Sequence, residues 1–368
     1  MPIIVIGLTV LLVIYLQNYC YRRLWDKGLG FRVLFSHREA FEGDELQIRM
    51  ELTNKKFLPL PWVYVKAEMS KEFQYDGTGD EKDSIMNSTG MLTSIMMFSM
   101  LRKRTYFTCK KRGVFRLYRA NINVCNLLHT EEFSKDVKLD GEVLVFPKTL
   151  EDFETVDLVY KVVDSVVQSK ALINPDPFEF RGIREYQPTD ALKSINFKAT
   201  AISQKLMVNI HAPTTAFKLT IVLNVDGSQN FSNRELYEQS IRLAATLAKY
   251  YIEAGANLSF LTNGRDTASG EALLVRGGNS GAHMYKIYEA LARIALRIKP
   301  RAMCKFADEF KDKEQVYFFI SPYLGDDFLD SFYRLKERQV SAHLVVPYFR
   351  RPTVGLAENI TIWDAKPL

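Results

Sequence analysis

Residues 218–230, KLTIVLNVDGSQN, decide the fold that the sequence predicts for the second half of the chain. The first part of this stretch, 218–225, is almost entirely aliphatic or β-branched, which is typical of a strand buried on both faces of a parallel sheet. The polar run that follows begins at Asp226, at the carboxyl edge where open α/β sheets hold their ligands. The sequence therefore predicts an α/β domain with a candidate site at the end of its first strand.

The chain downstream of this strand alternates between helical and extended patterns. Ser232 and Glu235 have the spacing of a capping box, which predicts a helix that begins there and ends at Gly255. Further strands are predicted at 257–262, 272–275, 315–320 and 342–346, and further helices at 282–298 and 326–337. This alternation indicates a doubly wound, mostly parallel sheet, which we assign to residues 216–368.

The loop after the first strand resembles the Asp-x-Ser-x-Ser metal-binding loop of von Willebrand factor A domains. Asp226 and Ser228 match that pattern, and Asn230 stands where the second serine belongs. The resemblance implies a von Willebrand factor A-like domain whose loop oxygens could hold Mg²⁺. Other ligands of the pattern are missing, because residues 277–283 contain no threonine and the loop after the fourth strand contains no aspartate. The alternative is that Asp226 and Ser228 only cap the turn and the following helix.

A second distinctive stretch, residues 178–215, precedes this domain. It resembles the signature segment of the bacterial "domain of unknown function 58" family at these positions: Arg184, Glu185, Tyr186, Asp190, Ile195, Asn196, Phe197, Lys198, Ala199 and Ala201. Phe197 replaces a tryptophan that is frequent in the family. The resemblance implies a membrane-anchored, cytoplasm-facing protein that serves as a non-enzymatic partner or adaptor of a MoxR-type AAA+ ATPase.

The signature has two interpretations for its charged residues, and both stay open. In one, Arg184, Tyr186 and Lys198 are presented to a partner, since interface anchors are rich in arginine and aromatic residues. In the other, charged residues such as Asp190 pair with basic neighbours within the fold. We expect the aromatic and aliphatic positions to pack against the α/β core: Ile195, Phe197 and Ala201.

The beginning of the chain predicts a single-pass membrane anchor. Residues 2–21 carry no charge, and about twenty such residues cross ~30 Å of hydrocarbon. Arg22, Arg23 and Lys27 follow at once, so the positive-inside rule places the bulk of the chain in the cytoplasm. A cleaved signal peptide is the alternative, which the lack of a basic segment before the apolar run disfavours. We expect four aromatic side chains at the headgroup level: Tyr15, Tyr19, Tyr21 and Trp25.

Residues 31–146 alternate apolar and polar side chains, as strands with one buried face do. In 45–54 the predicted buried face holds Leu46, Ile48, Met50 and Leu52. The runs 105–109 and 114–124 flank a turn at Gly113 and predict a hairpin. Such short strands indicate an antiparallel β-sandwich of immunoglobulin-like type. We expect a surface loop at 75–88 and a linker at 147–177 with a short helix at 156–168.

Composition narrows the classes of function. The net charge of +6 suits an acidic partner or an anionic membrane surface. Four cysteines without a Cys-x-x-Cys pair indicate reduced thiols. The basic cluster at 102–119 would suit nucleic acid, but alternation in a strand places such cations on a solvated face, and we expect no nucleic-acid partner.

Two functions therefore remain. The first is the adaptor of a MoxR-type AAA+ ATPase, and the alternative is a magnesium-dependent, adhesion-type ligand-binding module that acts without an ATPase. An envelope hydrolase is disfavoured, since the histidines are scattered and no nucleophile motif is present.

Overall fold

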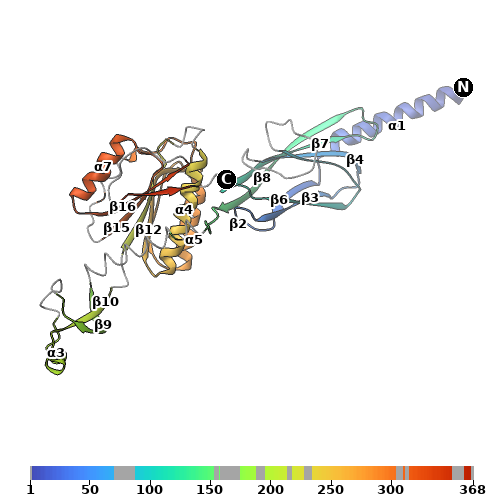
Figure 1. Cartoon of the computed structure of the whole chain (residues 1–368). Helices are drawn as coiled ribbons and strands as arrows, with labels where there is room; N and C mark the ends of the chain where they lie inside the picture. The colour runs from blue at the N-terminus through green and yellow to red at the C-terminus, as the bar shows by residue number, and fades with distance from the viewer. Residues whose placement is uncertain are drawn as a thin grey trace. The chain divides into compact units, whose positions relative to one another are not determined.

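The chain combines helices with several β-sheets (Figure 1). The computed structural model describes residues 2–69, 88–152, 157, 175–187, 195–213, 218–227, 234–303, 310, 315–349 and 360–365. The chain divides into two compact units, Met1–Lys148 and Thr149–Leu368. The surface loop expected at 75–88 and the helix expected at 156–168 lie outside the described residues, apart from Ser88 and Asp157.

The first unit is built from two sheets that share one hydrophobic core. One sheet is antiparallel and has the strand order β1 (Leu29–Phe35), β3 (Glu45–Asn54), β6 (Ser99–Thr108). The other has the order β2 (Glu39–Phe41), β8 (Glu132–Phe146), β7 (Gly113–Cys125), β4 (Leu60–Met69), β5 (Ser88–Ile95). The alternation predicted for β3 is confirmed, because its four apolar side chains are all buried: Leu46, Ile48, Met50 and Leu52.

The hairpin predicted around Gly113 is wrong. Strand β6 pairs with β3, whereas β7 pairs with β4 and β8, so the two runs belong to different sheets. The connection is held by another loop: the Cys109 amide donates to the Asp44 carbonyl at 2.9 Å, and the Arg112 amide donates to the Glu42 carboxylate at 2.8 Å. Gly113 does adopt a positive φ of 149°, but it turns the chain from one sheet to the other.

The cations of the basic cluster at 102–119 include two that pair with acidic side chains. Arg102 forms an ion pair with Glu51 at 3.0 Å, and Arg116 forms one with Glu142 at 2.8 Å. Of the two neighbouring aromatic residues, Phe107 is buried and the preceding tyrosine is exposed, as alternation along a strand requires.

Helix α1 (Pro2–Leu24) is long and apolar enough to span a membrane. Its carboxyl end packs onto the two sheets of the first unit. Tyr21 is only 1% exposed, and its hydroxyl donates to the Pro59 carbonyl at 2.7 Å. Trp25, just beyond the helix, stacks on Phe133 with ring centroids 5.5 Å apart. Tyr21 is therefore a core residue rather than the headgroup residue that we expected, while the other two tyrosines of the expected belt are exposed.

The second unit contains a seven-stranded sheet. Its main path runs β13 (Ala272–Gly278), β12 (Asn257–Asp266), β11 (Lys218–Leu223), β15 (Val316–Ile320), β16 (Ser341–Tyr348), β17 (Ile360–Asp364). The strands from β12 to β17 are parallel, and β13 is antiparallel to β12. A short β14 (Ile294–Ala295) also pairs with β12. Strand β17 was not predicted, and β14 ends the preceding helix earlier than expected.

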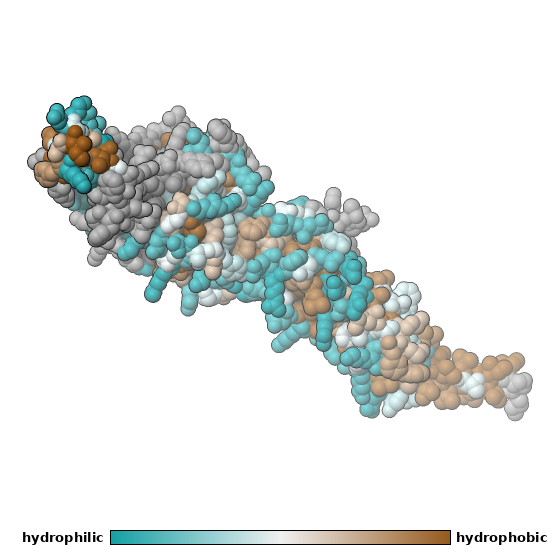
Figure 2. Space-filling model, turned by 90° about the horizontal axis from the view of Figure 1, so that it is seen from below, coloured by the Kyte–Doolittle hydropathy of each residue, from teal (hydrophilic) through white to brown (hydrophobic). Residues whose placement is uncertain are grey.

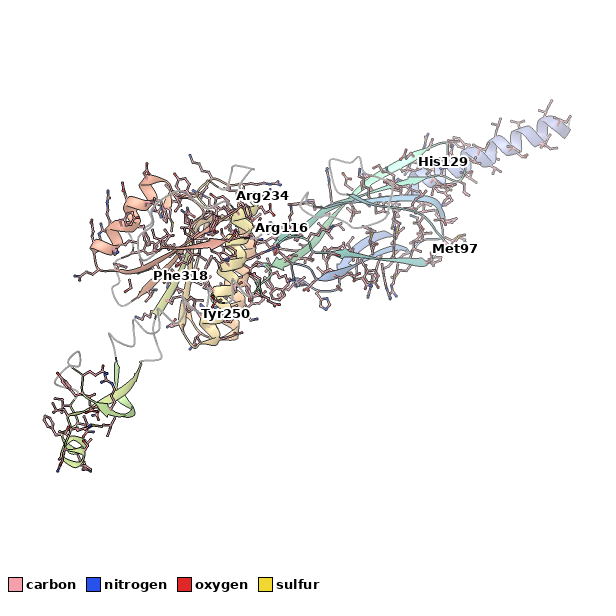
Figure 3. The ribbon with its side chains drawn as sticks, in the orientation of Figure 1. Met97, Arg116, His129, Arg234, Tyr250 and Phe318 are labelled. Carbon is pink, nitrogen blue, oxygen red and sulfur yellow. The ribbon has the colours of Figure 1, made fainter. Side chains whose placement is uncertain are left out.

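Helices cover both faces of this sheet (Figure 1). They are α4 (Arg234–Glu253), α5 (Gly281–Arg293) and α7 (Asp326–Glu337). On one face Ile221 and Phe318, the latter labelled in Figure 3, pack with α4 and α5. The centroids of the Phe318 and Tyr251 rings are 6.2 Å apart. On the other face Val222 and Phe319 pack with α7. The α/β pattern predicted from 218 onward is confirmed, including the bounds of α7.

The signature segment forms a separate two-stranded sheet with a short helix between its strands. The elements are β9 (Pro175–Glu185), α3 (Phe197–Ser203) and β10 (Met207–Pro213), and we call them the signature module. The two strands are antiparallel, with Glu185 opposite Met207. The start of β9 falls within the linker that we predicted at 147–177.

Candidate functional site

Polar side chains meet in one row at the carboxyl edge of the seven-stranded sheet. The register pairs Leu223 of β11 with Thr262 of β12 and with Ile320 of β15. The next residue along each strand is polar: Asn263, Asn224 and Ser321. All three are buried. This row lies where the strand order changes direction around β11, which is the position of ligand sites in open α/β sheets.

The row forms a saturated hydrogen-bond network. Asn224 donates from Nδ2 to Ser321 Oγ at 2.9 Å, and Asn263 donates from Nδ2 to Asn224 Oδ1 at 2.9 Å. Ser321 Oγ in turn donates to the Tyr323 carbonyl at 2.6 Å. Since buried polar groups are costly unless they are paired, this network fixes the three strand ends relative to one another. The Ser321 hydroxyl both accepts and donates within this network, and among the described residues no side-chain base bonds to it, so we interpret the row as a scaffold for the strand ends.

The scaffold positions Asp226 on a tight turn. The Asp226 amide donates to Asn224 Oδ1 at 2.9 Å, and one carboxylate oxygen accepts from the Met303 amide at 2.8 Å. Tyr237 donates from its hydroxyl to the Asp226 carbonyl. Gly227 follows with φ 79°, and a Cβ there would lie 2.8 Å from the Tyr237 hydroxyl. A glycine is required at this position for both reasons.

The electrostatic surroundings disfavour the charge on Asp226. Burial is the largest cause that raises the pKa of its carboxyl, and the nearby Asp327 carboxylate raises it further, while the bond from the Met303 amide lowers it. Asp327 also accepts from the Phe328 amide at 3.0 Å. Asp326 and Asp327 lie in the first turn of α7.

The magnesium loop is only partly within the described residues. Asp226 is placed, but Ser228 and Asn230 lie outside them. No group of three His, Cys, Asp or Glu side chains that could hold a metal ion occurs in the part of the chain that the structure describes. Asp226 has one oxygen committed to Met303, so the described residues alone do not make a magnesium site.

Ser280 and His283, at the start of α5, lie close in sequence and both make structural contacts. Ser280 is the N-cap of α5, and its hydroxyl accepts from the backbone amide of His283 at 3.2 Å. The His283 ring is buried, with Nε2 2.6 Å from the Leu258 carbonyl. Beside it, between β13 and α5, lies an open hollow of about 610 Å³ that the sequence did not indicate. Two of its charged side chains, Glu289 and Arg293, pair with each other at 3.0 Å.

The signature residues fall into two sets, those that bond within the signature module and those that are exposed on its surface. Asn196 belongs to the structural set: its Oδ1 accepts from the Ala199 amide at 2.9 Å as the N-cap of α3, and its Nδ2 donates to Asn209 Oδ1 at 2.7 Å. Thr200 accepts from the Met207 amide at 3.0 Å, and Ile195 forms a β-bridge with Val208. These contacts hold α3 against β10.

The other set faces outward. Phe197 is 78% exposed, and so is Ile202 on the same helix. Lys198 and Ala201 are also exposed, and α3 has no buried residue. The expectation that Phe197 and Ala201 pack against the α/β core is therefore wrong. The positions that face β10 are taken by the small residues 199 and 200, which leaves the large ones outside.

The remaining signature charges lie at the edge of the module. Glu185 pairs with Lys205 at 3.2 Å, both largely exposed. Arg184 donates from Nη1 to the Glu185 carbonyl at 3.0 Å, and Tyr186 is half-buried, with its amide bonded to the Leu206 carbonyl. Asp190 lies outside the described residues, so its pairing stays a prediction.

A family model described as "Protein of unknown function DUF58" matches residues 182–347. The match begins in β9 and ends in β16, so it includes the signature module from Gly182 onward and the polar row at the carboxyl edge of the sheet. A search of curated proteins gives no match.

Solved structures give distant likenesses. The CARDB domain of the PF1109 protein from Pyrococcus furiosus, in complex with di-metal ions, is 13% identical with a TM-score of 0.22, covering 32% of this chain and 94% of that one. Spo0M, a sporulation control protein of Bacillus subtilis, is 10% identical with a TM-score of 0.21, covering 44% and 58%. The C-terminal domain of wzt is 10% identical with a TM-score of 0.24, covering 34% and 77%. Scores this low carry no argument about fold or function.

Proposed function

Because the chain belongs to the DUF58 family of proteins of unknown function, we propose that it is a membrane-anchored, cytoplasm-facing adaptor of a MoxR-type AAA+ ATPase, without enzymatic activity of its own. Helix α1 would hold it in the cell membrane as a single-pass anchor. The residues Arg22, Arg23 and Lys27 just after the apolar stretch support the cytoplasmic orientation.

With this proposal goes a specific domain type for each of the two units. We infer a von Willebrand factor A-like domain in the second unit, supported by the strand order around β11 and by helices on both sheet faces. We infer an immunoglobulin-like β-sandwich in the first unit, supported by two sheets with a common core. Neither domain type requires a catalytic centre for binding a partner.

The observation that carries the adaptor proposal is the outward face of α3. A seven-residue helix that buries nothing, fixed at its start by Asn196, presents Phe197, Lys198 and Ile202 to the surroundings. Exposed apolar groups of this size next to a cation are typical of interface anchors. In Figure 2 the signature module carries brown hydrophobic atoms among teal ones.

Crosslinking in native membranes followed by purification of the full chain tests the proposal. We expect an AAA+ ATPase to be recovered with the parent chain and to be lost with Phe197→Ala. Tyr118→Ala is the matched control, because Tyr118 is an aromatic residue of the first unit that is 59% exposed. Absence of any ATPase from the parent preparation, or equal recovery with all three chains, would contradict the proposal.

The alternative is a magnesium-dependent ligand-binding module that acts without an ATPase. The position of Asp226 beside Asp327, at the edge where such sheets bind ligands, favours it. Here Mg²⁺ should raise the unfolding temperature of the parent chain and leave that of Asp226→Asn unchanged. No effect of Mg²⁺ on the parent would remove this alternative.

A further inference from the structure

The end of the first unit from which α1 leaves carries three loops with apolar tips. They are residues 55–59 between β3 and β4, 96–98 between β5 and β6, and 126–131 between β7 and β8. Their large hydrophobic side chains are exposed: Phe57, Met96, Met97, Phe98, Leu127 and Leu128. We call this surface the apolar end.

The strand register brings these loops to one end. Leu29, the first residue of β1, is opposite Asn54, the last of β3, and Asn54 is opposite Ser99, the first of β6. In the other sheet, Trp62 near the start of β4 is opposite Cys125, the last residue of β7. Met97 and His129 accordingly lie at the same end, next to the base of α1 (Figure 3).

Direct contacts tie two of the loops to α1 itself. Asn126 donates from Nδ2 to Asn18 Oδ1 at 2.9 Å, and Tyr21 donates to the Pro59 carbonyl at 2.7 Å. Lys56 also donates from Nζ to the Trp25 carbonyl. The last turns of the apolar helix and the loop tips are therefore at the same level.

The described loops at the opposite end of the same two sheets are polar. They are residues 36–38, 42–44 and 109–112. Their exposed residues are Ser36, His37, Arg38, Gly43, Asp44, Lys110 and Lys111. Turns of soluble proteins are usually rich in such residues. Among the described loops, apolar tips therefore occur at only one end of the two sheets.

One of the tips carries a large apolar residue although its backbone conformation favours glycine or asparagine. Phe98 has φ 49°, in the left-handed region where glycine or asparagine is favoured and a bulky residue is an outlier. Its ring is 66% exposed and packs edge-on against Phe57, which is 75% exposed, with centroids 5.9 Å apart. Folding alone favours a small or polar residue here, so the aromatic side chain points to a role outside the fold.

We propose that the apolar end rests in the interfacial layer of a phospholipid bilayer, with α1 passing through that bilayer. The candidate span Ile3–Leu24 has 22 residues. At ~1.5 Å per residue it extends ~33 Å, close to the ~30 Å of hydrocarbon. If residues 3–24 cross the bilayer, the membrane surface lies near Asn18 and Tyr21, which are the helix residues that the loops contact. Figure 2 shows the brown surface of α1 continuing onto the adjoining end of the first unit.

The charges at this end fit the same partner. Arg23, Lys27 and Lys55 are exposed around the base of α1, where they can meet lipid phosphates. The guanidinium of Arg23 lies 5.7 Å from the centre of the Tyr19 ring. Proteins that lie in a membrane interface typically combine aromatic rings and cations next to an apolar surface. The inference rests on the membrane anchoring in the proposed function and adds a second contact with the bilayer.

The test uses the full chain reconstituted into vesicles that contain lipids with brominated acyl chains, which quench tryptophan at short range. Phe98→Trp and Leu128→Trp place a new tryptophan at the apolar end. Tyr118→Trp places one at an equally exposed position on β7, away from the tips. Thermal unfolding in detergent confirms that the three variants fold like the parent.

We expect the added emission of Phe98→Trp and Leu128→Trp to be quenched at least about twofold more than that of Tyr118→Trp. If the chain floats with the vesicles but all three signals are quenched alike, the apolar end does not enter the interface, and the inference is wrong while the anchor stands. If the parent chain does not float with the vesicles at all, the anchoring in the proposed function is wrong, and this inference fails with it.

Discussion

The apolar end of the first unit and helix α3 of the second both expose large hydrophobic side chains, but in different settings. The apolar end stands on a two-sheet core and adjoins an apolar helix that can span a membrane. Helix α3 buries no residue and sits on a two-stranded sheet, with Lys198 beside Phe197. Exposure alone therefore does not identify the partner. The neighbouring sequence is the reason why we propose a bilayer for the first surface and a protein for the second.

The largest expected effect is the difference in unfolding free energy between removing a buried aromatic ring and removing an exposed one. Phe319→Ala should cost about 3 to 5 kcal/mol of unfolding free energy, because Phe319 is fully buried among Phe328 and Phe332. Phe197→Ala should change it by no more than about 0.5 kcal/mol. Chemical denaturation of the full chain in detergent measures both. A loss of several kcal/mol for Phe197→Ala would mean that the ring is packed, as its sequence context had suggested.

The next effect concerns partner recovery. We expect Phe197→Ala to lower ATPase recovery on the order of tenfold, as loss of an interface anchor does. Phe98→Ala should leave recovery unchanged, since Phe98 belongs to the apolar end. Quantitative crosslinking in native membranes compares the two variants. Equal losses would show that the two surfaces share one partner and would break the comparison.

Asn196 is the N-cap of α3, the helix that exposes Phe197, so this residue tests whether the cap holds that helix in place. Asn196→Ala removes the N-cap acceptor of α3 and should destabilise that helix by about 1 kcal/mol. Asn196→Asp is the matched control, because a carboxylate keeps the cap and loses only the donation to Asn209. Hydrogen exchange of the Ala199 and Thr200 amides should accelerate in the first variant and much less in the second. No acceleration in Asn196→Ala would mean that other contacts hold α3.

The smallest effect is the pH dependence at Asp226. Because burial and Asp327 raise the pKa of its carboxyl above the ordinary value, folding favours the protonated form. Its contribution to stability is full at low pH and is lost as pH rises through the raised pKa. Asp226→Asn should therefore equal the parent in acid and be more stable at neutral pH, by less than about 1 kcal/mol. Thermal unfolding across this pH range, without Mg²⁺, measures it, and a less stable variant at neutral pH would contradict the expectation.

The sequence was informative where the pattern is local and periodic. Alternation in 45–54 identified the buried face of β3, and Gly255, whose φ is 80°, marked the end of α4. The cap predicted at Ser232 lies outside the described residues. Burial on both faces of β11 was readable from its run of aliphatic residues. In these cases one segment contains all the information that its structure needs.

The misses depend on contacts between distant segments. Strand β6 pairs with β3, and the loop at 43–44 bonds to Cys109 just beyond the end of that pairing. No pattern near Gly113 reveals either contact. The buried row at the carboxyl edge needs the register of three parallel strands, although a polar residue directly after each apolar run is a usable signal. Phe197 was taken as buried because aromatic residues usually are. A seven-residue helix is too short for periodicity to show which face is covered.

Quenching by brominated lipids at two positions of the same chain tests the central comparison most directly. Phe98→Trp and Phe197→Trp each add a tryptophan at an exposed aromatic position, one on the apolar end and one on α3. In vesicles that carry the full chain, we expect strong quenching of the tryptophan at 98 and none of the tryptophan at 197. Quenching at both positions, or at neither, would contradict the assignment of one surface to lipid and the other to a protein partner.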